Sequence, residues 1–241
     1  MVRSKKAALS ILLFSLVFGG AAHAVSVTIG FEGGPQMTLN EAMLGCESAG
    51  GQGQLSCAGS NLAQPGGAWT LEDWNLFTDP DPVIQNSFSI VNNTGETQSF
   101  VVSVSLPVTI ASGPNSLIRG SVGGSATDLN ADGVTISSSG SNPLYEGLID
   151  GATARTLLDS PFSSNNPNAF GTVAVGPADF GIPIQEVVAL ALTTDMALTL
   201  RFDLTAGDSA ALTSVFNIVP EPGTALMLGL GLAGLAVRRG R

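Results

Sequence analysis

The sequence predicts an all-β protein, an antiparallel β-sandwich of the Ig-like or jelly-roll-like kind. Apolar and polar residues alternate along many short segments, and this period of two places apolar side chains on one face of a strand. Turn-forming residues separate the segments, and glycine is frequent, with 30 in the chain. Short strands recurring at this spacing are typical of two packed sheets.

The alternation is clearest where Phe100, Val102, Val104 and Leu106 would share one face of a strand. Two glycine-containing turns are expected to close hairpins. One is the segment NNTGET at 92–97. The other is Asp132-Gly133, for which a metal-binding loop is the alternative interpretation. The expected strands are 25–31, 68–77, 86–92, 97–110, 116–124, 133–140, 170–176, 186–192, 196–205 and 210–219.

The chain divides into three parts, of which the first is a secretory signal peptide at residues 1–24. Its basic start is followed by an apolar run from Ala7 to Phe18 and by the small-x-small pattern Ala22-His23-Ala24, after which signal peptidase would cut. An uncleaved anchor is the alternative, but the run is short for a membrane span. Residues 25–219 then form a single β-sandwich domain, and residues 220–241 are a separate C-terminal signal.

The charges exclude several functions. Six of the nine basic residues lie in the two terminal segments, so the body keeps three arginines against all nineteen acidic residues and contains no lysine. Phosphate binding needs lysine and arginine, so nucleic acid is excluded as a partner. The only histidine, His23, leaves with the signal peptide, and without histidine or lysine the common nucleophilic sites lack a base. We expect no enzymatic activity and no obligatory cofactor.

Residues 33–67 are expected to form a loop-rich excursion. Cys46 and Cys57 are separated by ten residues, and in an exported protein they predict a disulfide. A metal site is the weaker alternative, because no third cysteine or histidine is available to complete it. A short helix is possible at 38–44, where Thr38 would cap the helix and Glu41 lies three residues further on.

Two patterns in the body suggest ligands. Asp128, Asn130 and Asp132 alternate before Gly133, as in the first half of a calcium loop, although the twelfth position is Ser139 instead of glutamate. Trp69 and Trp74 adjoin Glu72-Asp73, where acids and sugar-stacking aromatics come together. The alternative is a strand whose tryptophans pack inward or at an edge.

The chain ends with Pro220-Glu221-Pro222, an apolar run at 223–237 and the arginines Arg238, Arg239 and Arg241. Fifteen helical residues at about 1.5 Å each span roughly 22 Å, less than a hydrocarbon core of about 30 Å, so the predicted transmembrane helix is a marginal anchor. The arginines would remain in the cytoplasm and leave the acidic body outside.

This tripartite end resembles the PEP-CTERM sorting signal of Gram-negative bacteria. The body is similar to uncharacterised family members in which NTG hairpins, a DxNxDG turn and an LxxGDSAxxTSxF strand, here 204–216, precede the signal. The resemblance implies transient lodging in the inner membrane and recognition of the Pro-Glu-Pro region by an exosortase. Removal of the tail would then release the product or transfer it to the cell surface.

The leading expectation is therefore an exported, exosortase-sorted surface or extracellular-matrix protein without enzymatic activity, associated with exopolysaccharide or biofilm. The alternative is a carbohydrate- or calcium-binding surface module that uses Trp69, Trp74 and the segment 128–132. A glycoside hydrolase with an acid pair is the third hypothesis.

Overall fold

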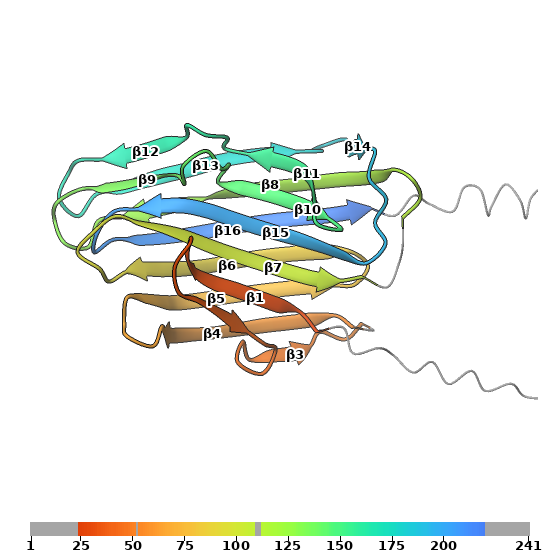
Figure 1. The fold of residues 1–241 in the computed structure, drawn as a ribbon, viewed down its shortest axis with the longest axis horizontal. Coiled ribbons are helices and arrows are strands. Elements are labelled where there is room, and N and C mark those ends of the chain that lie inside the picture. Colours follow the sequence, from red (N-terminus) through yellow and green to blue (C-terminus); the bar gives the residue numbers. More distant parts are fainter. Residues whose placement is uncertain (1–23, 52, 109–111, 220–241) are drawn as a thin grey trace, which may run out of the picture.

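The computed structural model describes residues 24–51, 53–108 and 112–219, and these form two antiparallel sheets of eight strands each (Figure 1). The first sheet contains β1 (Ser26–Phe31), β2 (Gln36–Leu39), β7 (Gln98–Pro107), β9 (Val134–Ser138), β10 (Tyr145–Ile149), β11 (Ala152–Leu157), β12 (Ser163–Asn166) and β15 (Asp195–Leu204). The second contains β3 (Cys46–Ser48), β4 (Leu55–Ala63), β5 (Trp69–Asp79), β6 (Val83–Asn92), β8 (Ser116–Thr127), β13 (Thr172–Phe180), β14 (Glu186–Val188) and β16 (Ser209–Val219). The predicted all-β sandwich is confirmed.

The strand order shows which segments meet across the sequence. The first sheet runs β11-β10-β15-β7-β1-β2, and β9 joins the far end of β15 and pairs with β12. The second runs β13-β8-β16-β6-β5-β4-β3, with β14 alongside β8. The longest pairing, β16 with β8, joins Ser209 to Thr127 at one end and Val219 to Leu117 at the other.

The core lies between the sheets, where the alternating apolar faces meet. Phe100 and Phe202 are cross-strand partners on β7 and β15, and their rings stack with centroids 5.5 Å apart. Phe88 of the second sheet lies 6.4 Å from Phe202, so the aromatic contact bridges the two layers. Tyr145 is fully buried and donates its hydroxyl to the carbonyl oxygen of Val215, 2.8 Å away on the opposite sheet. Burial raises the pKa of this phenol well above 10.0.

The predicted loop-rich excursion at 33–67 is corrected, because it contains three strands. Thr38 pairs with Thr28 in the β1–β2 hairpin, so it does not cap a helix. The predicted helix at 38–44 is replaced by a single turn, in which Leu44 donates its amide to the carbonyl oxygen of Asn40. Gly45, with a φ of 65°, follows the turn and lets the chain leave it.

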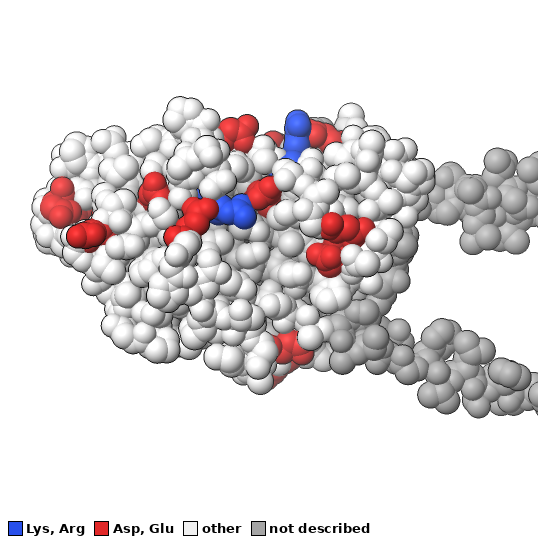
Figure 2. Space-filling view, in the orientation of Figure 1, with Lys and Arg blue, Asp and Glu red and all other residues white. Residues whose placement is uncertain are grey.

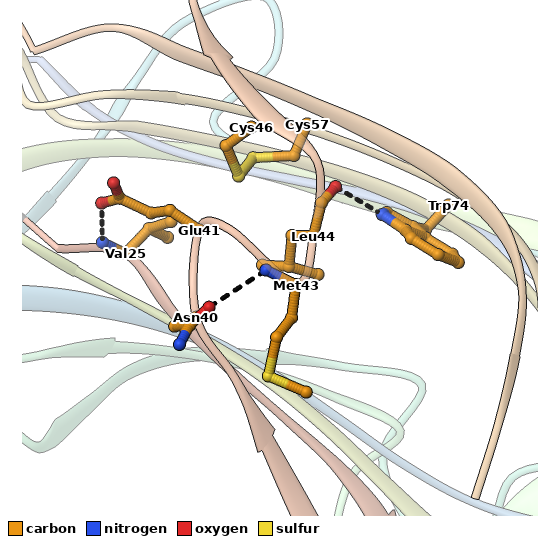
Figure 3. The surroundings of a disulfide bond; sticks show 8 residues. All are labelled: Val25, Asn40, Glu41, Met43, Leu44, Cys46, Cys57 and Trp74. Carbon is orange, nitrogen blue, oxygen red and sulfur yellow. Dashed lines mark hydrogen bonds between the residues drawn. A yellow bond between two sulfur atoms is a disulfide. The ribbon is translucent and has the colours of Figure 1, made fainter.

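The predicted disulfide between Cys46 and Cys57 is confirmed (Figure 3). These cysteines are directly paired residues of β3 and β4, so the bond fastens the edge strand of the second sheet to its neighbour. The same region is closed from inside by Leu44, whose carbonyl oxygen accepts the indole N–H of Trp74 at 3.0 Å.

The two predicted hairpins are also corrected. Residues 93–97 connect β6 to β7, and residues 128–133 connect β8 to β9; in both cases the chain passes from the second sheet to the first. The segment 204–216, expected to be one strand, is the end of β15, a connection at 205–208 and most of β16, again in different sheets. Alternation specifies the inward face of a strand but not its partner, and facing sheets are only about 10 Å apart, so a short loop can bridge them.

Strands β10, β11 and β12 were also not predicted. Within the described ranges, no helix is long and apolar enough to cross a membrane. The signal peptide, the segment 223–237 and the residues of the sorting motif lie outside the described residues.

Candidate functional site

The connections between the sheets gather at one end of the sandwich, which we call the loop end and define as residues 93–97, 128–133, 167–171 and 205–208. The side-chain amide of Asn130 donates to the carbonyl oxygen of Ala206 at 3.0 Å. The backbone amide of Gly207 donates to the carbonyl oxygen of Asn92 at 2.9 Å. The start of β1 and the end of β16 lie at the opposite end, which we call the tail end, on the right in Figure 1. The 11 residues of β16 run between the two ends, and the ten steps between them span about 33 Å.

Asp128 organises the loop end. Its Oδ1 accepts the amides of Asn130 and Ala131, and its Oδ2 accepts those of Gly133 and Phe170, at 2.8 to 3.0 Å. Burial by itself would raise the pKa of this carboxyl group, but the four amide hydrogen bonds outweigh it and hold the pKa below 3.8. A single carboxylate therefore joins the 128–133 connection to the loop before β13.

Asp208 brings a second buried carboxylate to the same place from the β15–β16 connection. It accepts the hydroxyl of Thr205 and, at 3.4 Å, the amide of Leu129. Burial raises its pKa, and the negative charges of Asp128 and Asp132 raise it further, against the effect of its hydrogen bonds. Asp128, Asp132 and Asp208 each place one carboxylate oxygen within 4.8 Å of the others.

The predicted calcium residues are thus brought together, with one change in the ligand set. Asp132 is exposed and joins Asp128 and Asp208, whereas the side-chain oxygen of Asn130 accepts the amide of Asp132 at 3.3 Å. Carboxylate oxygens suit Ca²⁺, which takes six to eight oxygen ligands at about 2.3–2.6 Å. Both oxygens of Asp128 already accept amides, so Asp132 and Asp208 are the better donors for a cation.

A polar hollow of 430 Å³ opens beside these carboxylates. It lies between the 93–97 connection, the start of β9, the end of β12 and the β15–β16 connection. The residues that line it include Glu96, Thr97, Asp132, Thr135, Asn165, Asn166, Pro167 and Thr205. Phe170, in the loop that follows Pro167, is 69% exposed. The hollow thus combines hydroxyl, amide and carboxylate groups with a nearby open aromatic ring.

The tryptophans take a different position from the one a sugar-binding platform needs. Trp69 is fully buried, so it has no ring face to offer a sugar, and the expectation for this residue is corrected. A bulge at Glu72 in β5 shifts the register, so that Trp69 and Leu71 before it and Trp74 after it all face the core. Trp74 is half-buried, and its N–H is already bonded to Leu44. Glu72 and Asp73 are exposed at the bulge.

The remaining charged cluster lies on the outer face of the first sheet. Arg201 of β15 contacts Glu146 of β10 at 2.6 Å and lies 3.9 Å from Glu32. Burial alone would raise the pKa of Glu146, but the hydrogen bonds from Thr153 and Arg201 and the charge of Arg201 lower it. Figure 2 shows this face, where acidic groups outnumber basic ones. In this cluster one arginine forms ion pairs with two glutamates, and it joins β15 to β10 and to the chain after β1.

The class of protein follows from the body and from the residues that come after it: an acidic two-sheet sandwich with an apolar, arginine-ended C-terminal segment. The family model of the PEP-CTERM protein-sorting motif matches residues 219–241. The chain therefore carries a PEP-CTERM sorting motif, as its last residues predicted, and this motif implies sorting by an exosortase to the cell surface or beyond. No curated protein matches the chain.

Two residues of the loop end were missed from the sequence. Asp208 stands in the motif GDSA, with no calcium-like spacing around it, and it reaches Asp128 only because β16 pairs with β8. Phe170 had been included in a strand, but it precedes β13 in a turn with a φ of 56°. Its neighbours Asn168 and Gly171 were the available signal for a turn.

Proposed function

We propose that the protein is a non-enzymatic component of the extracellular matrix of a Gram-negative bacterium, associated with exopolysaccharide through its loop end. The observation that carries the proposal is the polar hollow of 430 Å³ at the end of the sandwich opposite Val219, the residue at which the sorting motif begins. A chain held at the membrane by its tail would present this hollow outward, toward secreted polymer.

The lining chemistry supports a polysaccharide ligand. Asn165 and Thr135 offer an amide and a hydroxyl, which donate and accept hydrogen bonds, and Glu96 and Asp132 accept them. The exposed ring of Phe170 adds an apolar surface against which the face of a sugar ring can pack. We therefore propose Phe170, and not Trp69, as the residue that stacks on a sugar ring.

Sedimentation with the producer's own exopolysaccharide tests the ligand. We expect Asn165→Ala and Phe170→Ala each to weaken co-sedimentation about tenfold, as the loss of one good hydrogen bond or one stacked ring predicts. Asn75→Ala, an exposed asparagine on the outer face of the second sheet, is the matched control and should bind as the wild type does. Equal binding by all three variants would reject the loop end as the site.

The same polymer distinguishes binding from hydrolysis. The body has no histidine or lysine, so acid–base chemistry would depend on carboxylates such as Glu72 and Asp73. We propose that these carboxylates do not act on polysaccharide, and we expect no release of reducing ends. Measurable release that is lost in Glu72→Gln would replace the matrix proposal with a glycosidase.

The details of sorting are tested separately. Replacing Pro220, Glu221 and Pro222 with alanines should leave a full-length, membrane-bound species, because the exosortase would no longer recognise the segment. Intact mass of the protein from wild-type and variant cells reports both terminal cleavages. A variant whose mass shows that the tail has been removed, as in the wild type, would show that these three residues do not direct its removal.

Calcium is the second candidate ligand, favoured by the approach of Asp208 to Asp128 and Asp132. A cation bound only by the folded protein raises the melting temperature as its concentration increases. We expect such a rise with calcium in the wild type and its loss in Asp132→Ala, whereas Asp159→Ala, another exposed aspartate, keeps it. An equal rise in Asp132→Ala would remove this loop as the site.

A further inference from the structure

At the tail end, three large apolar side chains are open to solvent. Ile182, Ile184 and Val187 are 56%, 80% and 67% exposed, and we call them the apolar edge. They belong to β14 and to the connection that leads to it from β13. Large apolar side chains gathered on one edge mark a surface that contacts something other than water.

The apolar edge adjoins the point where the described chain ends. Val187 pairs with Leu117 of β8, and Leu117 pairs on its other side with Val219 of β16. Paired residues share a face of the sheet, so the three form an apolar row across the outer face of the second sheet. Neighbouring strands are about 4.8 Å apart, which places Val187 about 10 Å from Val219. Figure 1 shows β14 at the end where β16 stops.

The chain between this row and the apolar tail segment is very short. The tail segment begins at Gly223, four residues after Val219, and four extended residues reach at most about 14 Å. While the tail is inserted, the tail end of the sandwich must therefore lie at the membrane surface. The loop end is about 33 Å farther along β16.

We propose that the apolar edge lies on the lipid surface of the membrane while the sorting tail is inserted, an inference that rests on anchoring by that tail. Side chains of this kind enter the boundary between headgroups and acyl chains, at a depth of about 5–10 Å. On the face of the second sheet that carries the apolar row, the neighbouring charges fit an anionic lipid surface better than those of the acidic body as a whole. Asp150 and Asp195, also at the tail end, belong to the first sheet. Arg119 is exposed two residues after Leu117 on the same face, and Arg155 compensates Glu186 at 3.1 Å. Asp179 lies beside Ser121, farther toward the loop end.

This contact would orient the sandwich. A tether of four residues alone leaves the body free to swing, whereas a second contact on one edge restricts it. The Pro-Glu-Pro segment would then be held at a constant height and facing one direction beside the membrane. Once the tail is removed, the three side chains alone are a weak attachment, so the product can leave.

The test places a fluorescent label at one end of the full chain. Cys46 and Cys57 are joined, so the thiol in Ile184→Cys is the one that reacts with an environment-sensitive dye. Phe170→Cys, at the loop end and equally open, is the matched control. The protein is reconstituted into vesicles of phosphatidylethanolamine and phosphatidylglycerol, with and without a nitroxide quencher on the lipid headgroup.

We expect a blue shift and strong quenching for the label at Ile184→Cys, and neither for the label at Phe170→Cys. Val187→Cys is a second labelling site and should behave like Ile184→Cys. Equal quenching at the two ends, or none at either, overturns the proposal. Shielding that depends on protein concentration also overturns it, because the edge would then contact protein.

Vesicle flotation separates the premise from the proposal. Protein that floats with the vesicles but shows no quenching at Ile184→Cys has an inserted tail and a free apolar edge. Protein that does not float shows that the tail does not hold the chain in lipid, and the inference is then wrong together with its premise.

Discussion

The two ends of the sandwich are each held by an aspartate, but in different electrostatic surroundings. At the tail end, Asp150 follows β10 and accepts hydrogen bonds from the amides and hydroxyls of Thr193 and Thr194 and from the amide of Asp195. At the loop end, Asp128 accepts four amides but shares its place with Asp132 and Asp208. Both aspartates join distant connections. Asp150 has one acidic neighbour, Asp195, whereas Asp128 lies within a cluster of three carboxylates.

The difference shows in the pKa values. Burial alone would raise the pKa of Asp150, but its hydrogen bonds, led by that from Thr193, lower it far below 3.8. The pKa of Asp128 is also lowered, whereas that of Asp208 is raised by burial and by its two acidic neighbours. An aspartate that only closes a turn does not need two acidic side chains beside it. The crowding therefore marks the loop end as the part of the body suited to a ligand.

The largest effect is expected from Asp128→Ala. This change leaves four amides of the loop end without their acceptor, and it should lower the melting temperature by about 10 °C. Thermal unfolding followed by circular dichroism measures it. Asp132→Ala is the control, since among the described residues this exposed side chain accepts a hydrogen bond only from Asn130, and it should change the melting temperature little. Equal losses in both variants would contradict the organising role of Asp128.

A smaller loss is expected from Asp150→Ala. The hydrogen bonds from Thr193, Thr194 and Asp195 are lost, but Asp150 is exposed, so water replaces part of them, and the melting temperature should fall by about 5 °C. Because the folded-state pKa is lowered, this stabilisation is present above pH 3.8 and is lost as the pH falls below it. The difference between wild type and variant should therefore shrink in acid. A difference that grows in acid would contradict the assignment.

The smallest effect, of opposite sign, is expected from Asp208→Asn. A raised folded-state pKa means that ionised Asp208 destabilises the fold, so its favourable contribution is present below pH 3.8 and lost as the pH rises through the raised value. At pH 7 and without calcium, the variant should melt about 2–3 °C higher than the wild type. The gain should vanish near pH 3, as unfolding curves at several pH values would show. A loss of stability at pH 7 would mean that its hydrogen bonds outweigh the repulsion.

The strands were predictable where alternation was long, as in β7 and β15, because the period of two is a local property of the chain. Several strands of three to six residues, such as β3 and β12, were missed, because they carry too few alternating residues to stand out. The nine-residue β4 was missed because its sequence LSCAGSNLA does not alternate between apolar and polar residues. The hairpins were wrong for another reason. Residues 93–97 have the composition of a turn, and a turn can close a hairpin or cross between sheets with the same residues.

The candidate site was predicted in part. The spacing of Asp128, Asn130 and Asp132 revealed the acidic connection, but Asp208 is 80 residues from Asp128 and could be found only after the strands were paired. Trp69 illustrates the converse case. Its sequence neighbours suggested a surface platform, and the register of β5 turned it into the core.

By itself, the sequence determined the all-β class, the disulfide and the sorting motif, since each depends on residues close together along the chain. Only the tertiary structure decided which sheet each strand joins, which acids meet at the loop end and which apolar side chains remain open beside the tail. These depend on pairing between distant segments, which is selected by the packing of two whole faces and leaves no local signature.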